Sequence, residues 1–202
     1  MTLADLKERA LSYALSQVAD VSHGEGHIRR VIKNALRLAE NYPIADRDIL
    51  YLAAALHDCG QKEQLERPGV HHADAGAKKA KAWLASSGAG EAVAERVAQI
   101  IAAHSSRALS EASGLEARLL FDADKLEMAG AVGLSRALIY ALDRGEELYS
   151  DKGESFYSVA KNDMEFVLSG LFTPEAREIA RDRLELGESF LKSLKAEADI
   201  DD

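Results

Sequence analysis

The chain has 202 residues and a formal net charge of −9, from 34 acidic and 25 basic side chains. This length suits one ordinary domain with a substantial core, and 47% apolar with 29% charged residues is typical of globular proteins. Because an acidic surface repels polyanions, we expect no nucleic-acid polymer as a partner. A phosphorylated substrate would need a metal ion or local basic residues to offset this charge.

Cysteine content and hydropathy indicate the compartment. The single cysteine, Cys59, cannot form an internal disulfide, which favours a reducing environment, and we expect it to be a small buried apolar residue. The first ten residues, MTLADLKERA, do not resemble a signal peptide, and no stretch approaches the roughly 18 apolar residues that a membrane helix needs. We therefore expect a cytoplasmic protein without a membrane partner.

Helix-period patterns run along the chain, and we find no convincing period-2 run of β-branched residues. Pro43 and Pro174 mark helix ends, because proline disfavours helical geometry in the residue before it and suits the first position of a helix. The predicted fold is an all-α, single-domain bundle of about nine helices. They are expected near residues 3–19, 24–41, 46–57, 72–87, 90–104, 115–127, 130–144, 154–170 and 174–197.

A polar stripe adjoins the apolar stripe of the helix expected at 24–41. His23, His27 and Arg30 share this polar stripe, with His27 beside the apolar residue Val31. A boundary position is ordinary for a histidine, so His27 alone indicates little.

The helix expected at 46–57 is apolar almost all round, which is typical of a buried helix. It ends in His57 and Asp58, two ionisable side chains that are costly in a buried segment unless they are paired, hydrogen-bonded or bound to a metal. A structural His–Asp pair that caps the core would also explain them.

Two further histidines occupy apolar helix faces. His72 leads the helix expected at 72–87, and His104 closes the helix expected at 90–104. Each could by itself be a hydrogen-bonded core histidine. His71 lies about 100° around the helix from His72 and is expected in solvent.

The segment DADKLEMAGAVG adds two acidic residues. A helical wheel places Asp124 with Leu120, facing inward, and Asp122 on the other side with Arg118 and Lys125. We therefore predict that Asp124 is the buried carboxylate and that Asp122 is solvated or salt-bridged. A lone inward aspartate could also cap a neighbouring helix.

Taken together, these inward imidazoles and carboxylates on several core helices have one economical explanation, a shared divalent cation. The mixed nitrogen and oxygen set argues against a thiolate-rich structural zinc site. It suits an ion such as Mn²⁺, Fe²⁺, Ni²⁺, Co²⁺, Zn²⁺ or Mg²⁺ with open positions for water. The candidate ligands are His27, His57, Asp58, His72, His104 and Asp124.

These residues lie in motifs that resemble the HD-domain metal-dependent phosphohydrolases. The matching segments occur in family order and cover residues 20 to about 140. The segment DADKLEMAGAVG is closest to small bacterial and archaeal members thought to hydrolyse nucleotides. The segments are HGEGHIRRV, LHDCG, HHADAGAKKAKAWL, IIAAHSSR and DADKLEMAGAVGLSRAL.

The resemblance implies one HD-type domain over 1–202, with its core at about 20–140 and the helices of 154–197 packed on it. It also implies hydrolysis of phosphate esters or anhydrides, with a nucleotide or another small phosphate as the substrate. Matched position by position, the first-metal ligands are His27, His57, Asp58 and Asp124. The positions of a second metal are His72 and His104.

The sequence departs from the family pattern just after the doublet. Many members continue as Asp-Ile-Gly-Lys, whereas this chain has Cys59 for the apolar residue and Gln61 for the lysine, with Lys62 one position later. Members that cleave alarmones carry acidic residues here, and Glu63 is out of register. We therefore do not expect alarmone hydrolysis.

The expected mechanism uses water activated by the metal. Asp58 is expected to anchor the nucleophilic water, and with a single metal His72 and His104 would contact phosphate or transfer a proton. Candidate substrate contacts, each of which could also be a solvated surface charge, are His23, Arg30, Lys62 and Lys125.

A segment at 143–158 interrupts the late helices and contains Tyr149, Phe156 and Tyr157. It could be a lid whose aromatic rings stack on a base, although aromatic residues are more often part of a core. Two other functions stay open, a di-iron oxygenase built on the same ligands and a nucleotide sensor without catalysis. The sequence does not predict the oligomeric state.

Overall fold

A computed structural model describes residues 2–18, 20, 22–105, 113–150 and 153–198. Within these residues the chain is all-α, with no strand and a single isolated bridge between Glu147 and Ser155. The predicted fold class is confirmed, and each of the nine predicted helices is present. No described helix combines the length and the apolar character that crossing a membrane requires.

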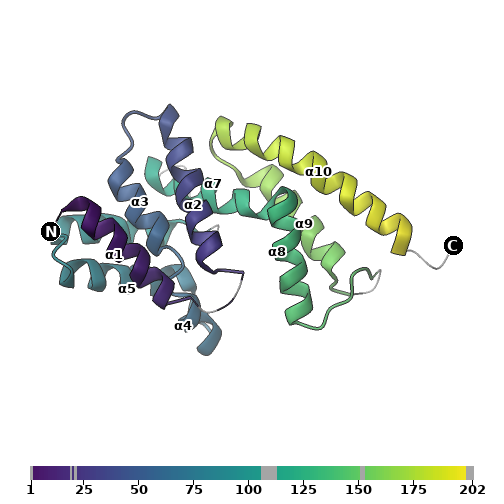
Figure 1. The fold of residues 1–202 in the computed structure, drawn as a ribbon, viewed down its shortest axis with the longest axis horizontal. Helices are drawn as coiled ribbons and strands as arrows, with labels where there is room; N and C mark the ends of the chain where they lie inside the picture. The colour runs from purple at the N-terminus through teal and green to yellow at the C-terminus, as the bar shows by residue number, and fades with distance from the viewer. Residues whose placement is uncertain (1, 19, 21, 106–112, 151–152, 199–202) are drawn as a thin grey trace. The chain divides into compact units, whose positions relative to one another are not determined.

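Contacts divide the chain into two compact units, Met1–Ala123 and Asp124–Asp202. The prediction of one domain over the whole chain therefore stays a prediction. Helix α7 begins in the first unit, and its last two residues belong to the second. The helical elements that begin in the first unit are α1 (Leu3–Ser16), α2 (Glu25–Leu38), the 3-10 turn η1 (Ala39–Asn41), α3 (Arg47–Leu56), α4 (Gln61–Glu66), α5 (His72–Ser86), α6 (Glu91–Ala103) and α7 (Leu115–Lys125) (Figure 1).

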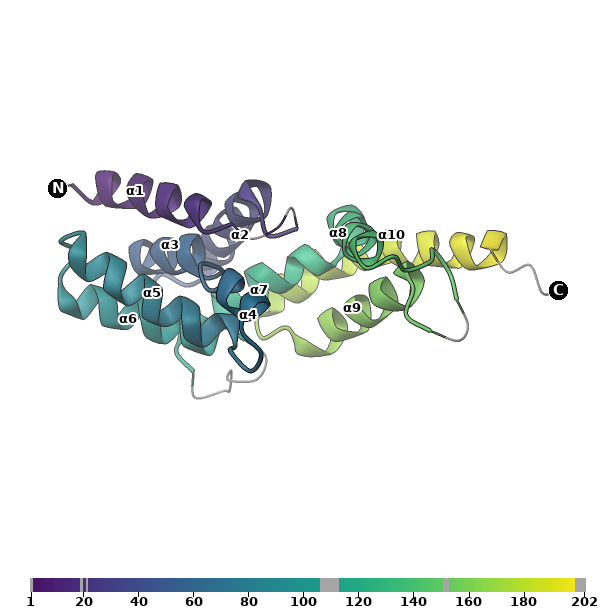
Figure 2. The same ribbon diagram turned by 90° about the horizontal axis from the view of Figure 1, so that it is seen from below.

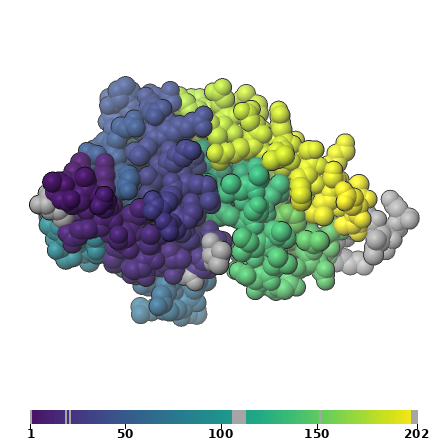
Figure 3. All heavy atoms as spheres, viewed as in Figure 1, coloured from purple at the N-terminus to yellow at the C-terminus, as the bar shows by residue number. Residues whose placement is uncertain are grey.

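Helix α3 is the central element of the first unit. It contacts α1, α2 and α6, and Figure 2 shows it between α1 on one side and the α5–α6 pair on the other. This position explains its apolar sequence, since Leu50, Leu52 and Leu56 are each at most 1% exposed. Burying a leucine of this kind stabilises the fold by about 1.5–3 kcal/mol. The side chains of α1, purple in Figure 3, lie at the surface of this unit.

The second unit is a set of three long helices that contact one another pairwise. Its last helix begins as predicted, because the Thr173 hydroxyl accepts a hydrogen bond from the backbone N–H of Ala176 at 3.3 Å, with Pro174 at the first helical position. The elements are η2 (Leu126–Met128), α8 (Gly130–Asp143), α9 (Phe156–Gly170) and α10 (Pro174–Ala198).

The structure differs from the predicted elements in two ways. The helices expected at 24–41 and 115–127 are α-helical only to Leu38 and Lys125, and each is followed by a 3-10 turn. Helix α4 was not predicted, because its six residues, QKEQLE, are too few and too polar to show a helical period. In the sequence, this short helix lies between Asp58 and His72.

Candidate metal centre

Three of the predicted ligands meet inside the first unit. The Nε2 atoms of His27 and His57 lie 3.3 Å apart, and each lies 3.2 Å from Oδ2 of Asp58. His27 comes from the first turn of α2, whereas His57 and Asp58 directly follow α3. Ligand atoms held at about 2.1 Å from one ion lie roughly 3.0–3.4 Å apart in octahedral or tetrahedral geometry. The three atoms therefore have the spacing of a metal-ligand set.

Backbone carbonyls fix the orientation of two buried histidines. Nδ1 of His57 donates to the carbonyl oxygen of Ala54 at 2.8 Å, and Nδ1 of His104 donates to that of Ile101. A proton on Nδ1 leaves the lone pair of a neutral imidazole on Nε2. This arrangement is usual for histidines that bind metals, and it keeps both rings ready to donate to a cation.

A second candidate ligand group adjoins the first. Asp58, His72 and His104 each offer one ligand atom, and these atoms lie within 4.8 Å of one another. The rings of His57 and His104 are 5.4 Å apart between centroids, as are those of His72 and His104. Asp58 belongs to both sets, so one carboxylate could bridge two ions.

The electrostatics favour an ionised Asp58. Burial alone would raise the pKa of this carboxyl, but positive charge and hydrogen bonds from the Nε2 side of His57 and His27 outweigh it and hold the pKa well below its usual range. A cation bound to the Nε2 lone pairs would supply that positive charge instead. Gln61 adds a hydrogen bond at 3.0 Å from its Nε2 to Oδ1 of Asp58. An ionised carboxylate is the form that binds a metal.

The structure corrects the assignment of the two α7 acids. Asp122 is fully buried, so the alternative that it is solvated is wrong, and Asp124 is half-buried with 14% of its side chain exposed. Asp124 follows Ala123 directly, and the carbonyl of Ala123 accepts a hydrogen bond from Asn34 of α2 at 3.4 Å. Asn34 is two turns from His27 on the same face of α2.

The predicted substrate residues of the first unit have different surroundings. The ring of His23 lies 5.7 Å from that of His27, edge to face, and its Nδ1 pairs with Asp20 at 2.9 Å. Arg30 is half-buried. Lys62 is on the exposed side of α4, 3.8 Å from Glu66, like an ordinary surface lysine.

The second unit contains the other predicted contacts. Nζ of Lys125 lies 3.0 Å from Asp124 and 5.9 Å from the centre of the Phe166 ring. Phe156 is 3% exposed and packs near Phe190, so it belongs to the core rather than to a base-stacking lid. Tyr149 and Tyr157 contact each other at 5.1 Å and are half-buried. Residues 151–152 of this segment, and 106–107 of the IIAAHSSR motif, lie outside the described residues.

Cys59 and His71 flank the metal groups without joining them. Cys59 is 2% exposed, its thiol lies 3.4 Å from the Gly76 carbonyl, and burial raises its pKa to about 12. The prediction of a small buried residue is confirmed. His71 is half-buried and caps α5 by accepting a hydrogen bond from the N–H of Ala73 at 3.3 Å, so the expectation of a solvated residue was only partly right.

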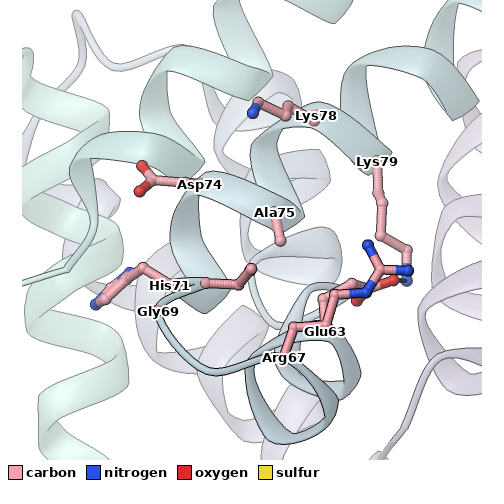
Figure 4. Close-up of a pocket in the computed structure, with 9 residues that line it drawn as sticks. Glu63, Arg67, Gly69, His71, Asp74, Ala75, Lys78 and Lys79 are labelled. Carbon is pink, nitrogen blue, oxygen red and sulfur yellow. Dashed lines mark hydrogen bonds and ion pairs between the residues drawn. The ribbon is translucent and has the colours of Figure 1, made fainter.

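A surface pocket of about 500 Å³ lies between α4, the 67–71 loop and α5 (Figure 4). The head groups of Arg67, Glu63 and Lys79 gather on one side of it, with His71 on the other. Lys79 and Glu63 are paired at 2.7 Å. Acidic and basic side chains nearly balance around this pocket, which has neither the donor set nor the burial of the metal groups.

Sequence reasoning missed two residues that contact the ligands, Gln61 and Gln64. Oε1 of Gln64 accepts hydrogen bonds at 2.9 Å from both the backbone N–H and Nδ1 of His72. The departure at Gln61 was noted, but without α4 nothing in the sequence indicated that either glutamine faces a ligand.

Comparisons with known proteins concern the family and the fold. Residues 24–129 match the family model of the HD domain. The protein YpgQ of Bacillus subtilis (strain 168) is 28% identical over 194 residues, which are 93% of this chain and 91% of YpgQ. The crystal structure of YpgQ in complex with ADP has a TM-score of 0.79 and 27% identity, covering 98% of this chain and 97% of that one. An HD-superfamily hydrolase from Bacillus thuringiensis has a TM-score of 0.73 and 25% identity, covering 98% of this chain and 100% of that one.

Proposed function

This chain belongs to the HD domain family, and from that premise we propose that it is a divalent-metal-dependent phosphohydrolase. It would cleave a phosphate ester or anhydride of a nucleotide or another small phosphate. The observation that carries the proposal is the convergence of His27, His57 and Asp58, with ligand atoms 3.2–3.3 Å apart. Buried imidazoles around a buried carboxylate are costly without a cation and well suited to one.

We assign the first ion to His27, His57, Asp58 and Asp124. The second candidate group, in which His72 and His104 join Asp58, provides for a second ion. Nitrogen and oxygen ligands without a thiolate suit manganese, iron, cobalt, nickel, zinc or magnesium. Cys59 belongs to neither ligand group of the described residues, and its thiol instead lies 3.4 Å from the Gly76 carbonyl.

A bound divalent ion supplies Lewis acidity, which acidifies water and polarises a phosphoryl oxygen. The protein contributes orientation and proton transfer. Ionised Asp58 can hold the attacking water by accepting its hydrogen bond, and His57 and His104 keep their Nε2 lone pairs directed away from their carbonyl partners. With a single ion bound, His72, which is half-buried at the N-terminus of α5, can exchange a proton with solvent and the leaving group.

A nucleotide is the favoured substrate class for two reasons. YpgQ, which resembles this chain over nearly its full length, has been crystallised with ADP. The net charge of −9 also makes a small phosphate a better partner than a nucleic-acid polymer, because the cation offsets the charge locally. His23, just before α2, and Arg30 of α2 lie near His27 in the sequence and are our candidates for phosphate contacts, with Lys62 and Lys125 as weaker ones.

The test is a substrate screen on metal-free protein reloaded with each divalent cation in turn. Nucleoside mono-, di- and triphosphates and sugar phosphates are incubated, and phosphate and pyrophosphate are measured separately to identify the bond that breaks. We expect metal-dependent release of one of these products. Tight nucleotide binding without release under any metal would instead support a sensor. Iron-dependent oxygen uptake without phosphate release would support an oxygenase.

A further inference from the structure

We infer that α4 is a positioning helix for the metal centre, in which Gln64 orients His72 and Gln61 orients Asp58. The inference rests on the proposed function, since it assigns a role to two glutamines around the proposed ligands. It assigns no direct metal or substrate contact to either glutamine. Four observations within the first unit carry it.

The first observation is that the start of α4 is in backbone contact with α5. A Cβ atom added at Gly60 would lie 2.2 Å from the carbonyl oxygen of His72 and 2.3 Å from the backbone nitrogen of Gly76. Only a glycine allows this approach. As a result, the start of α4 is held in a fixed position relative to the backbone of His72.

The second observation is the double contact of Gln64. A backbone N–H can only donate, so the atom of Gln64 that lies 2.9 Å from the His72 nitrogen must be an acceptor oxygen. The same oxygen lies 2.9 Å from Nδ1 of His72, which must therefore carry the proton. The lone pair of His72 is then on Nε2. Gln64 thus does for His72 what backbone carbonyls do for His57 and His104.

The third observation concerns Asp58. Its Oδ2 lies 3.2 Å from the Nε2 atoms of both His27 and His57, while its Oδ1 accepts a hydrogen bond from Gln61 at 3.0 Å. The amide of Gln61, which is 8% exposed, therefore fixes the rotation of the carboxylate about its last bond. This rotation decides which oxygen faces the two histidines.

The fourth observation is that the two glutamines act on different ligand groups. His72 belongs only to the group of Asp58, His72 and His104, whereas Asp58 belongs to both groups. Removing the Gln64 contact should therefore lower the affinity for the second ion only. Removing the Gln61 contact should lower the affinity for both ions, and this difference between the two variants separates positioning from a general loss of stability.

The experiment measures metal binding without substrate, so that it does not depend on turnover. Mn²⁺ is titrated by calorimetry into metal-free wild type, Gln64→Leu, Gln64→Glu and Gln61→Leu, and paramagnetic resonance distinguishes isolated from coupled ions. For Gln64→Leu we expect the second affinity to fall about 10- to 100-fold with the first nearly unchanged. Gln64→Glu, which keeps an acceptor oxygen, should bind two ions. Gln61→Leu should lower the affinity for both ions.

The matched control is Gln99→Leu, because Gln99 is an exposed helical glutamine whose amide binds a neighbouring carboxylate, Glu95, at 3.0 Å. It should bind Mn²⁺ as wild type does. Two ions bound with unchanged affinity in Gln64→Leu would overturn the inference, as would wild type that binds a single ion. The second outcome leaves the proposed function intact, whereas wild type that binds no divalent ion overturns the proposed function itself.

Discussion

At the scale of single residues, Asp58 has the largest role, because it lies beside His27 and His57 and also forms a candidate ligand group with His72 and His104. A carboxylate that is buried among imidazoles stays ionised only while they offset its desolvation. The depressed pKa of Asp58 indicates that His57 and His27 achieve this. Its charge is therefore present throughout the neutral range.

We predict that Asp58→Ala abolishes metal-dependent turnover and lowers divalent-metal affinity at least about 100-fold, because each ion loses an anionic ligand. Calorimetric titration with Mn²⁺ and the phosphate-release assay measure the two effects. Glu95→Ala is the control, since Glu95 is an exposed acid of α6 that pairs with Lys81 at 2.7 Å. Wild-type affinity in Asp58→Ala would show that the ion binds elsewhere.

Asp163 of α9 is a second unusual carboxylate, and it lies in the second unit. Burial raises its pKa to about 6, despite the opposing charges of Lys125 and Arg136. A folded-state pKa above the unfolded value of 3.8 favours folding below pH 3.8, and this contribution is lost as the pH rises through about 6. Ionised Asp163 therefore lowers the stability of the native protein at neutral pH.

Asp163→Asn should thus stabilise the protein at pH 8 relative to wild type, by at most about 3 kcal/mol, and much less at pH 4.5. Urea denaturation of both proteins at the two pH values measures the difference. Equal effects at both pH values would show that Asp163 stays protonated at pH 8, or that neighbouring charges fully offset the cost of burying its ionised form. Asp182→Asn on α10 supplies a control for the loss of one negative charge.

The two acids of α7 show where residue-level prediction from the sequence stopped. A helical wheel assumes one buried face, but the consecutive residues from Leu119 to Ala123 are all at most 2% exposed. A helix buried on all sides gives no contrast between its faces, so the wheel predicted that Asp122 could be solvated when it is fully buried. The predictions of His57, Asp58, His72 and His104 rested on helix ends, where a sequence break marks the position directly, whereas His27 was predicted from a polar stripe.

At the scale of elements, the long helices were predictable because each repeats apolar residues at helical spacing over three turns or more. Helix α4 was not, because it depends on contacts with α5 rather than on its own sequence. Gly60 is the residue that permits these contacts. Contacts of this kind are decided by packing between segments, which sequence periodicity does not report.

We predict that Gly60→Ala destabilises the protein by about 1–3 kcal/mol, because its methyl group would overlap backbone atoms that cannot rotate away. Thermal and urea denaturation measure the loss, and second-ion affinity should fall with it because α4 shifts. In the control Gly114→Ala, the added methyl group meets only the Glu116 carboxylate at 3.9 Å, and stability should change little. A fully stable Gly60→Ala would show that α4 can move away without cost.

At the scale of the whole molecule, the proposed ligands connect helices that are distant in the sequence. His27 precedes His104 by most of the first unit, and α2, α3, α5 and α6 each bring one or two ligands. An ion that binds only the folded arrangement must stabilise it. The expected size is about 2.7 kcal/mol when the free ion is at 100 times its Kd.

For a chain of this length, that free energy corresponds to a rise of roughly 5–10 °C in the melting temperature. A rise could also come from screening of the net charge of −9, which any salt would provide. We therefore predict that Mn²⁺ raises the melting temperature of wild type, that NaCl of equal ionic strength does not, and that Asp58→Ala loses the response. Equal shifts in wild type and Asp58→Ala would mean that the cation acts as a counterion, because a site-bound ion cannot stabilise a fold from which its shared ligand has been removed.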